Sequence, residues 1–340
     1  MKEKKITTTS EKGNSILDIE GLMVGHYTDI EAMCGVTAII CTEGAIASVD
    51  VRGSAPGTRE TDLLDPVNLV EEVQGVVLSG GSVFGLAASD GVVRWLAEKG
   101  LGFQLGDNHV APIVPAATLY DLGRGRNFVP SINAEWGRKA CDNARNDLPA
   151  SGCVGAGVGA ISGGIKGGLG TASLSLGNGL IVAAIVAVNS LGSIINPMNG
   201  RPWEFGLEMK DEFGHQGKRA VRLPPITGVS AGKNTTIGVV ATDADLSKTQ
   251  ALKIAQMAHD GMARAIRPSH TMFDGDTIFC LATCKKQVPE SRGIFPNPKA
   301  NAINELGDAA ANCMSRAIIK GVLSAESLGG ITAFCDLEDL

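Results

Sequence analysis

The stretch Gly232-Lys-Asn-Thr-Thr-Ile-Gly-Val-Val-Ala241 joins a polar, turn-forming segment directly to a strongly apolar run. The β-branched residues that follow Thr236 favour a strand. The junction between Asn234 and Thr235 therefore lies at the start of a predicted strand. By residue type alone it is commonly a turn followed by a strand, but self-cleaving hydrolases also cut their own chain at such junctions.

That self-cleavage chemistry needs only the groups at the junction itself. The hydroxyl of Thr235 attacks the carbonyl carbon of Asn234 and forms an ester, and hydrolysis of the ester leaves Thr235 as a new N-terminus. A free α-amine has a pKa of about 7.7–8.0, so part of it is neutral at pH 7 and can accept the hydroxyl proton. Nucleophile and base would then belong to one residue.

Downstream of the junction, helices and strands are predicted in alternation. Ser247 and Gln250 have the spacing of a capping box and begin a helix whose apolar stripe ends before Pro268. The remaining elements are a strand over Thr277–Thr283, a long helix over Ile303–Val322 and a closing strand over Gly330–Phe334.

The upstream part continues this alternation. Strands are predicted over Gly35–Cys41, Ala45–Val51, Val76–Leu78, Gly152–Ser162 and Leu180–Val188, and a helix over Leu86–Lys99. The first two strands are expected to be neighbours around the turn at residues 42–44. Residues 1–14 are polar and are expected to form a disordered tail. Because no linker or repeat follows, residues 15–340 are expected to form a single domain of sheets covered by helices.

The composition excludes several classes of protein. Of 340 residues, 44% are hydrophobic and the net charge is only −6, which excludes a disordered chain. No run of Lys and Arg follows the first five residues, so neither nucleic acid nor a membrane is expected as a partner. The longest apolar run, Leu180–Val188, is too short to span a bilayer. Without an apparent export signal, a cytoplasmic protein with reduced cysteines is expected.

No metal or cofactor is expected from the motifs. Cys280 and Cys284 have a spacing that some zinc fingers use, but no histidine lies near them, and buried thiols are the ordinary interpretation. The run Gly155–Ala160 resembles a dinucleotide fingerprint, yet further glycines follow where a helix should begin. A glycine-rich β region is the simpler interpretation.

Several motifs, in order along the chain, resemble one family. They are Val51-Arg-Gly-Ser-Ala-Pro-Gly-Thr-Arg-Glu-Thr61, Leu78-Ser-Gly-Gly-Ser-Val-Phe-Gly-Leu86, the glycine-rich region ending in Lys166, Val186-Ala-Val-Asn189, Asn234-Thr-Thr-Ile-Gly-Val-Val-Ala-Thr-Asp243 and Arg267-Pro-Ser-His-Thr-Met-Phe-Asp-Gly-Asp-Thr277. From about Gly21 to the C-terminus, the chain resembles the family of L-aminopeptidase/D-esterases, β-aminopeptidases and 6-aminohexanoate-oligomer (nylon) hydrolases. Members of this family are self-cleaving N-terminal-nucleophile hydrolases.

The resemblance implies a four-layer αββα sandwich and a cut between Asn234 and Thr235. The products would be an α chain of residues 1–234 and a β chain of residues 235–340, with Thr235 as the nucleophile. Asp274 and Asp276 match the acidic pair of the nylon-hydrolase branch and would orient and activate the hydroxyl and the amine of Thr235. Taken alone, Asp274-Gly-Asp276 is elsewhere a turn or a fragment of a calcium loop.

Three further residues match the family by position. Lys166 and Asn189 correspond to residues beside the nucleophile and would stabilise an oxyanion through an ammonium and an amide donor. Tyr120 corresponds to a substrate-contacting tyrosine. The ordinary interpretations are a solvated turn lysine, a strand-end cap and a core residue, respectively. His259 and His270 lie close to the motif and are expected to be structural, since this chemistry needs no histidine.

The types of residue at the nucleophile and the acidic pair indicate a substrate class within the family. Aminopeptidase members usually carry Ser as nucleophile and a Ser/Glu-like pair, whereas Thr235 with two aspartates resembles the nylon-oligomer branch. The resemblance thus implies a hydrolase of linear oligoamides, short peptides or amino-acid amides, assembled as a homo-oligomer, commonly a tetramer. Two other enzymes stay open: an aminopeptidase/D-esterase or β-aminopeptidase without oligoamide activity, and an acyltransferase of the ornithine acetyltransferase type. A non-catalytic binding module is disfavoured because the whole residue set is present.

Overall fold

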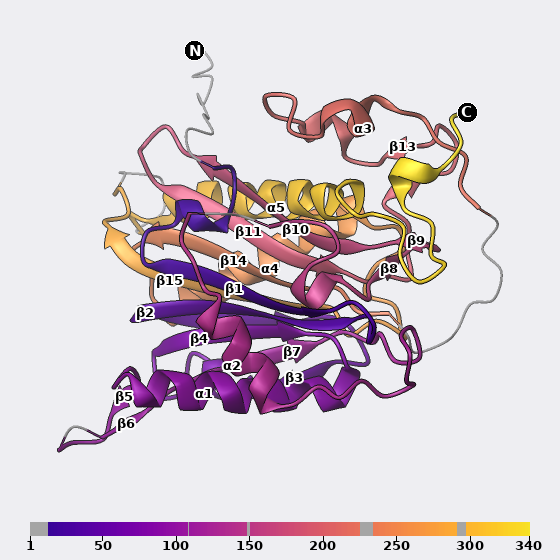
Figure 1. Cartoon of the computed structure of the whole chain (residues 1–340). Helices are drawn as coiled ribbons and strands as arrows, with labels where there is room; N and C mark the ends of the chain where they lie inside the picture. The colour runs from indigo at the N-terminus through magenta and orange to yellow at the C-terminus, as the bar shows by residue number, and fades with distance from the viewer. Residues whose placement is uncertain (1–12, 108, 148–149, 225–233, 291–296) are drawn as a thin grey trace, which may run out of the picture.

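Four layers make up the molecule (Figure 1). The computed structural model describes residues 13–107, 109–147, 150–224, 234–290 and 297–340. Helices α4 (Lys248–Ala265) and α5 (Ala300–Leu323) cover one outer face of the strands, and α1 (Ala88–Glu98) and α2 (Ala134–Asp142) cover the opposite face. The expected αββα sandwich is confirmed.

The strands form one hydrogen-bonded path that folds into two facing layers. Its order is β10-β11-β14-β15-β2-β4-β7-β3, and β1 pairs with β2 beside this path. The bounds are β1 Leu22–Asp29, β2 Cys34–Val51, β3 Gly57–Arg59, β4 Glu72–Ser79, β7 Ala116–Thr118, β10 Gly168–Ser175, β11 Ile181–Val188, β14 Ile237–Ala244 and β15 Thr277–Lys286. Shorter elements are β5 Phe103–Gln104, β6 Val110–Ala111, β8 Ile161–Ser162, β9 Ile165–Lys166, β12 Ile195–Asn196, β13 Arg201–Pro202 and α3 Gly214–Lys218.

The long strand β2 belongs to both layers. Its first half pairs with β1 and β4, and its second half pairs with β15. The prediction of two separate strands around residues 42–44 is wrong. The chain stays extended through an irregularity between Ile40 and Ala45, where Gly44 adopts a φ of 80° and the strand changes register against β4. This bulge lets one strand leave the first layer and enter the second.

Alternation along the strands builds two kinds of core. On β11, Val182 and Val186 pack against the α4–α5 layer, whereas Ala183 and Ile185 face the space between the sheets. Ile39 of β2 meets them from the other layer. Because side chains of a strand point to opposite faces in turn, continuous apolar strands of this kind are covered on both sides.

Two predicted strands are wrong. Gly152–Ser162 is mostly a turn with a short 3-10 helix at Gly155–Gly157, and only Ile161–Ser162 is extended. Gly330–Phe334 is a turn that leads into a 3-10 helix at Phe334–Asp336. Gly155 and Gly330 have φ values of 52° and 78°, far from the extended backbone of a regular strand.

The predicted helix over Leu86–Lys99 is observed with a different beginning. A 3-10 helix at Ser82–Ala87 leads directly into α1. The capping box of α4 is confirmed, with the Ser247 side chain accepting from the Gln250 N–H and the Gln250 side chain accepting in return. Within the described ranges, no helix is both long and apolar enough to span a membrane.

Parts of two sequence predictions lie outside the described residues. Residues 1–12 of the expected N-terminal tail are among them, as are Gly232 and Lys233 before the junction. Asn14, at the end of that expected tail, is held in the fold: its amide donates to Glu212 at 2.6 Å, and its side-chain oxygen accepts from Arg316 at 2.9 Å.

Candidate active site

Thr235 lies at the start of β14, between the ends of β11 and β15. Its N–H donates to the carbonyl oxygen of Asn189, one residue beyond β11, at 2.5 Å. The next residue, Thr236, accepts from the Thr277 N–H at 3.2 Å and donates its own N–H to Asp276 Oδ1 at 2.8 Å. The backbone on both sides of the nucleophile candidate is therefore fixed by neighbouring strands.

The hydroxyl of Thr235 is aimed at the peptide bond that precedes it. Thr235 Oγ1 donates to the carbonyl oxygen of Asn234 at 2.5 Å and accepts from the Gly275 N–H at 3.2 Å. The residue is only 5% exposed. A hydroxyl in this position contacts the carbonyl that it would attack in self-cleavage.

A pocket of about 320 Å³ opens beside Thr235. Its lining includes Pro56, Thr118, Tyr120, Asn234, Thr235 and Phe273. The structure thus places Tyr120 and the junction on the wall of one cavity. None of the described residues that line it is charged. A larger hollow of about 550 Å³ between α5 and residues 206–209 contains no predicted site residue.

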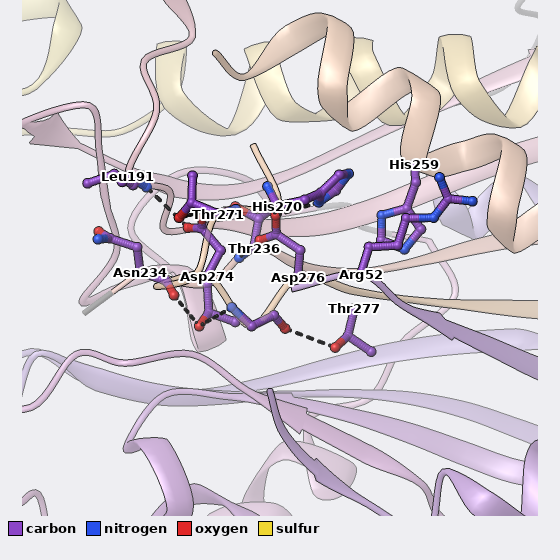
Figure 2. Close-up of polar contacts among 12 residues, drawn as sticks. Arg52, Leu191, Asn234, Thr236, His259, His270, Thr271, Asp274, Asp276 and Thr277 are labelled. Carbon is purple, nitrogen blue, oxygen red and sulfur yellow. Dashed lines mark hydrogen bonds and ion pairs between the residues drawn. The ribbon is translucent and has the colours of Figure 1, made fainter. Parts of the chain in front are cut away.

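Asp274 and Asp276, labelled in Figure 2, flank Gly275, whose N–H donates to the hydroxyl of Thr235. Asp274 Oδ2 accepts from the Thr271 hydroxyl at 2.5 Å and the Thr271 N–H at 3.0 Å. Asp276 binds Thr236 and His270. Among the described residues, neither carboxylate bonds Thr235 directly, so both hold the backbone around it. Burial, together with the charge of Asp276, raises the pKa of Asp274.

The ammonium of Lys166 is bound by backbone carbonyls. It donates to the carbonyl oxygens of Gly157, Ala160 and Gly167 at 3.2, 3.0 and 2.8 Å. The side chain is completely buried, and this burial lowers the pKa of Lys166 to about 8. The predicted placement of this ammonium on an oxyanion receives no support from its hydrogen bonds, because three backbone carbonyls engage it.

The side chain of Asn189 anchors the loops behind Thr235. Its oxygen accepts from the Ile161 N–H at 3.0 Å and from Arg124 at 2.5 Å, and its amide donates to the carbonyl oxygen of Tyr120 at 3.1 Å. Arg124 also donates to the carbonyl oxygen of Gly159. Asn189 therefore joins the segment of Tyr120, the segment of Ile161 and the backbone N–H of Thr235.

Two residues near the site were not predicted from the sequence to contribute to it. Arg124 has no motif signal beyond its position four residues after Tyr120. Burial lowers the pKa of Arg124 to about 10, so it still carries its charge at neutral pH. His270, predicted to be structural, lies directly on Asp276, and its signal was its place four residues before Asp274.

The fold places the chain in a structural class. The l-aminopeptidase d-Ala-esterase/amidase of Ochrobactrum anthropi, described as a variant of the Ntn hydrolase fold, superimposes with a TM-score of 0.72 at 23% identity, covering 96% of this chain and 90% of that one. A β-aminopeptidase of Burkholderia sp. superimposes with a TM-score of 0.71 at 21% identity, covering 96% and 92%. The chain has an Ntn-hydrolase fold.

The sequence comparison names the family. The chain belongs to peptidase family S58, which matches residues 14–334. An uncharacterized aminopeptidase of Mycobacterium tuberculosis is 43% identical over 348 residues, covering 95% of this chain and 98% of that protein. A 6-aminohexanoate-oligomer endohydrolase of Kocuria sp. is 30% identical over 314 residues, covering 89% and 84%. The resemblance described from the motifs is confirmed.

Proposed function

We propose that this protein is a self-processing amide hydrolase that uses Thr235 first on its own chain and then on linear oligoamides, short peptides or amino-acid amides. One observation carries the proposal: Thr235 Oγ1 lies 2.5 Å from the carbonyl oxygen of Asn234, at the rim of a cavity. Family membership supports it, because the relatives include enzymes named as aminopeptidases and as an oligoamide endohydrolase.

The self-cleavage step moves one acyl group. Thr235 Oγ1 attacks the carbonyl carbon of Asn234, the carbon–nitrogen bond breaks, and the departing nitrogen of Thr235 takes up the proton that the hydroxyl loses. Water then hydrolyses the ester, giving a carboxylate on Asn234 and a free hydroxyl and amine on Thr235. In turnover the same amine accepts the hydroxyl proton and returns it to the amine leaving group of the substrate.

The surrounding groups fix the geometry of these steps. The Gly275 N–H holds Thr235 Oγ1, and the Asn189 carbonyl holds the nitrogen that becomes the amine. Asp274 and Asp276 orient the Gly275 turn and Thr236, and Lys166 with Asn189 supports the loops behind the nucleophile. Holding reacting atoms in position accounts for a large part of catalysis in such sites. We assign Lys166 to this support instead of to direct contact with an oxyanion.

The pocket bears on the substrate. The described residues that line the cavity are neutral, and none of them offers a carboxylate to bind a substrate ammonium beside the reacting carbonyl. This favours a substrate whose charged groups lie far from the reacting carbonyl, as in a linear oligoamide, and we propose that Tyr120 contacts the substrate.

We also propose that the protein forms a homo-oligomer and is cytoplasmic. Sedimentation of the purified protein tests the oligomer, and cell fractionation tests the location.

A substrate panel tests the proposal. Initial rates would be compared on linear 6-aminohexanoate oligomers, α-dipeptides and amino-acid p-nitroanilides, with T235A as the control that lacks the hydroxyl. We expect turnover of the oligoamide by the wild type and none by T235A. Robust turnover of α-dipeptides with none of the oligoamide would assign the enzyme to aminopeptidase activity instead. Equal rates for T235A and the wild type would contradict the nucleophile assignment.

A further inference from the structure

His270 holds one oxygen of Asp276 through two hydrogen bonds. Its backbone N–H donates to Asp276 Oδ2 at 3.0 Å, and its ring Nδ1 lies 2.8 Å from the same oxygen. Asp276 is 2% exposed, so solvent does not compete strongly for this carboxylate. With Oδ2 held in this way, Oδ1 is directed to the Thr236 N–H at 2.8 Å.

The proton of the imidazole ring is placed by its partner. A carboxylate accepts hydrogen bonds and does not donate them, so Nδ1 of His270 carries the hydrogen. Figure 2 shows Asp276 and His270 between Asn234 on one side and His259 with Arg52 on the other. The ring therefore donates to Asp276 Oδ2 through Nδ1, and Asp276 Oδ1 in turn accepts from the Thr236 N–H. These two hydrogen bonds connect His270 to the backbone next to Thr235.

The backbone of His270 adopts a left-handed conformation. Its φ is 54°, in the left-handed region that residues other than Gly adopt uncommonly and that Asn, Asp and His adopt more often than most. This conformation brings the N–H and the ring onto the same carboxylate oxygen.

A second histidine encloses the ring. His259 lies edge-on to His270, with ring centroids 4.9 Å apart. His259 is completely buried, its Nε2 lies 2.9 Å from the Asp50 carbonyl oxygen, and burial lowers its pKa to about 4. The charged groups beyond it, Asp50 and Arg52, pair with each other at 2.6 Å. Among the described residues, His270 Nε2 has no hydrogen-bond partner, so the only hydrogen bond of the ring is the one to Asp276.

We propose that His270 is a positioning residue for the nucleophile: by holding Asp276 Oδ2 it fixes Oδ1 on the Thr236 N–H and thereby the orientation of Thr235. The proposal rests on the proposed function, because it assigns His270 to the same self-cleavage and hydrolysis. The reacting atoms lie on Thr235 and its acyl partner, so His270 acts through Asp276 and Thr236. Its loss should lower kcat more than it raises KM.

Two comparisons separate this role from a structural one: H270G with H270N, and H270N with H270D. H270G keeps the left-handed backbone and its N–H but removes the ring, whereas H270N keeps the backbone conformation and places an amide N–H near the position of Nδ1. We expect self-cleavage and kcat to fall by about 10²-fold in H270G, the size of effect that misplacement of reacting groups produces. H270N should restore most of the loss, with the thermal midpoints of the two variants matched.

H270D completes the test should H270G fail to fold. The Asp side chain has the size of the Asn side chain and tolerates the same φ, but it places a second carboxylate against Asp276 and offers no N–H. We therefore expect H270D to be slow under conditions in which H270N is active. A kcat of H270G equal to that of the wild type, or equal rates for H270N and H270D, would overturn the role proposed for His270. The proposed function would still stand in that case, provided that the wild type cleaves before Thr235. Failure of the wild type to cleave before Thr235 would instead contradict the proposed function.

Discussion

The backbone N–H of Gly275 donates to the hydroxyl oxygen of Thr235 at 3.2 Å, and this contact leaves no room for a side chain at position 275. A Cβ there would lie 2.6 Å from the carbonyl oxygen of Ala55 and 3.0 Å from Thr235 Oγ1. The turn between the two aspartates therefore both binds the nucleophile candidate and depends on glycine to do so.

G275A should consequently move Thr235 without removing any hydrogen-bond donor. We expect self-cleavage and turnover to slow by about 10²-fold, because a displaced nucleophile loses its alignment with the carbonyl. The measurement is the rate of precursor disappearance together with kcat. G206A is the matched control, since a Cβ at Gly206 meets no atom within 4 Å. Equal rates for G275A and G206A would refute the steric argument.

T235S should keep part of both activities, and T235A should lose both. Serine retains the hydroxyl but lacks the γ-methyl group that restricts χ1, so its oxygen is aimed less strictly at Asn234. Electrophoresis under denaturing conditions follows processing, and the oligoamide assay follows turnover. Asn234→Ala should be tolerated, because only the carbonyl of that residue reacts. Cleavage of T235A at this junction would mean that another nucleophile acts.

Arg124→Gln should loosen the support of Asn189. Arg124 donates to Asn189 Oδ1 at 2.5 Å and to the Gly159 carbonyl oxygen. Asn189 Oδ1 would keep the Ile161 N–H, but the Gly159 carbonyl oxygen would lose this donor, and a buried acceptor left without a partner costs about 1–3 kcal/mol. We expect a lower free energy of unfolding and slower self-cleavage. Arg126→Gln is the control, because its pair with Glu31 is long, at 3.9 Å, and both side chains are more than 80% exposed. Denaturant titration that gives the same stability for both variants would count against this role.

Lys166 should make stability depend on pH in a definite direction. Its pKa is about 8 in the fold against the ordinary value of 10.5. Between these values the unfolded chain binds the proton more fully than the folded chain, so the free energy of unfolding attributable to Lys166 rises with pH across this window. Lys166→Met should lack that rise. Urea unfolding of both proteins at pH 8 and pH 10 measures it, and parallel changes in the two proteins would contradict the assignment.

The sequence predicts those parts of the fold whose signals are local. The capping box at Ser247 and Gln250 fixes the start of α4 because both of its hydrogen bonds lie within four residues. The strand β14 follows from its β-branched run in the same way. The irregularity in β2 could not be predicted, because the two halves of that strand are held by different partners, β4 and β15, that lie far away in sequence.

The same distinction applies to the site. Asn234, Thr235, Asp274 and Asp276 are found from the sequence because they belong to short motifs, and the structure brings them together. Arg124 carries no motif signal, and His270 was expected to be only structural, because their contacts with Asn189 and Asp276 are created only in the folded chain. The hydrogen bonds of Lys166 could not be predicted for a similar reason: two of the three carbonyls that accept from it, those of Gly157 and Ala160, belong to a turn that the sequence suggested as a strand.

The central claim is that Thr235 frees itself and becomes the N-terminus that catalyses hydrolysis. Intact mass and N-terminal sequencing of the purified wild type and of T235A test it most directly. We predict two chains for the wild type, residues 1–234 and 235–340, together one water heavier than the precursor, with Thr235 first in the smaller one, and a single uncut chain for T235A. A wild-type chain that stays uncut and nevertheless hydrolyses amides, or a cut at any other bond, would contradict the account.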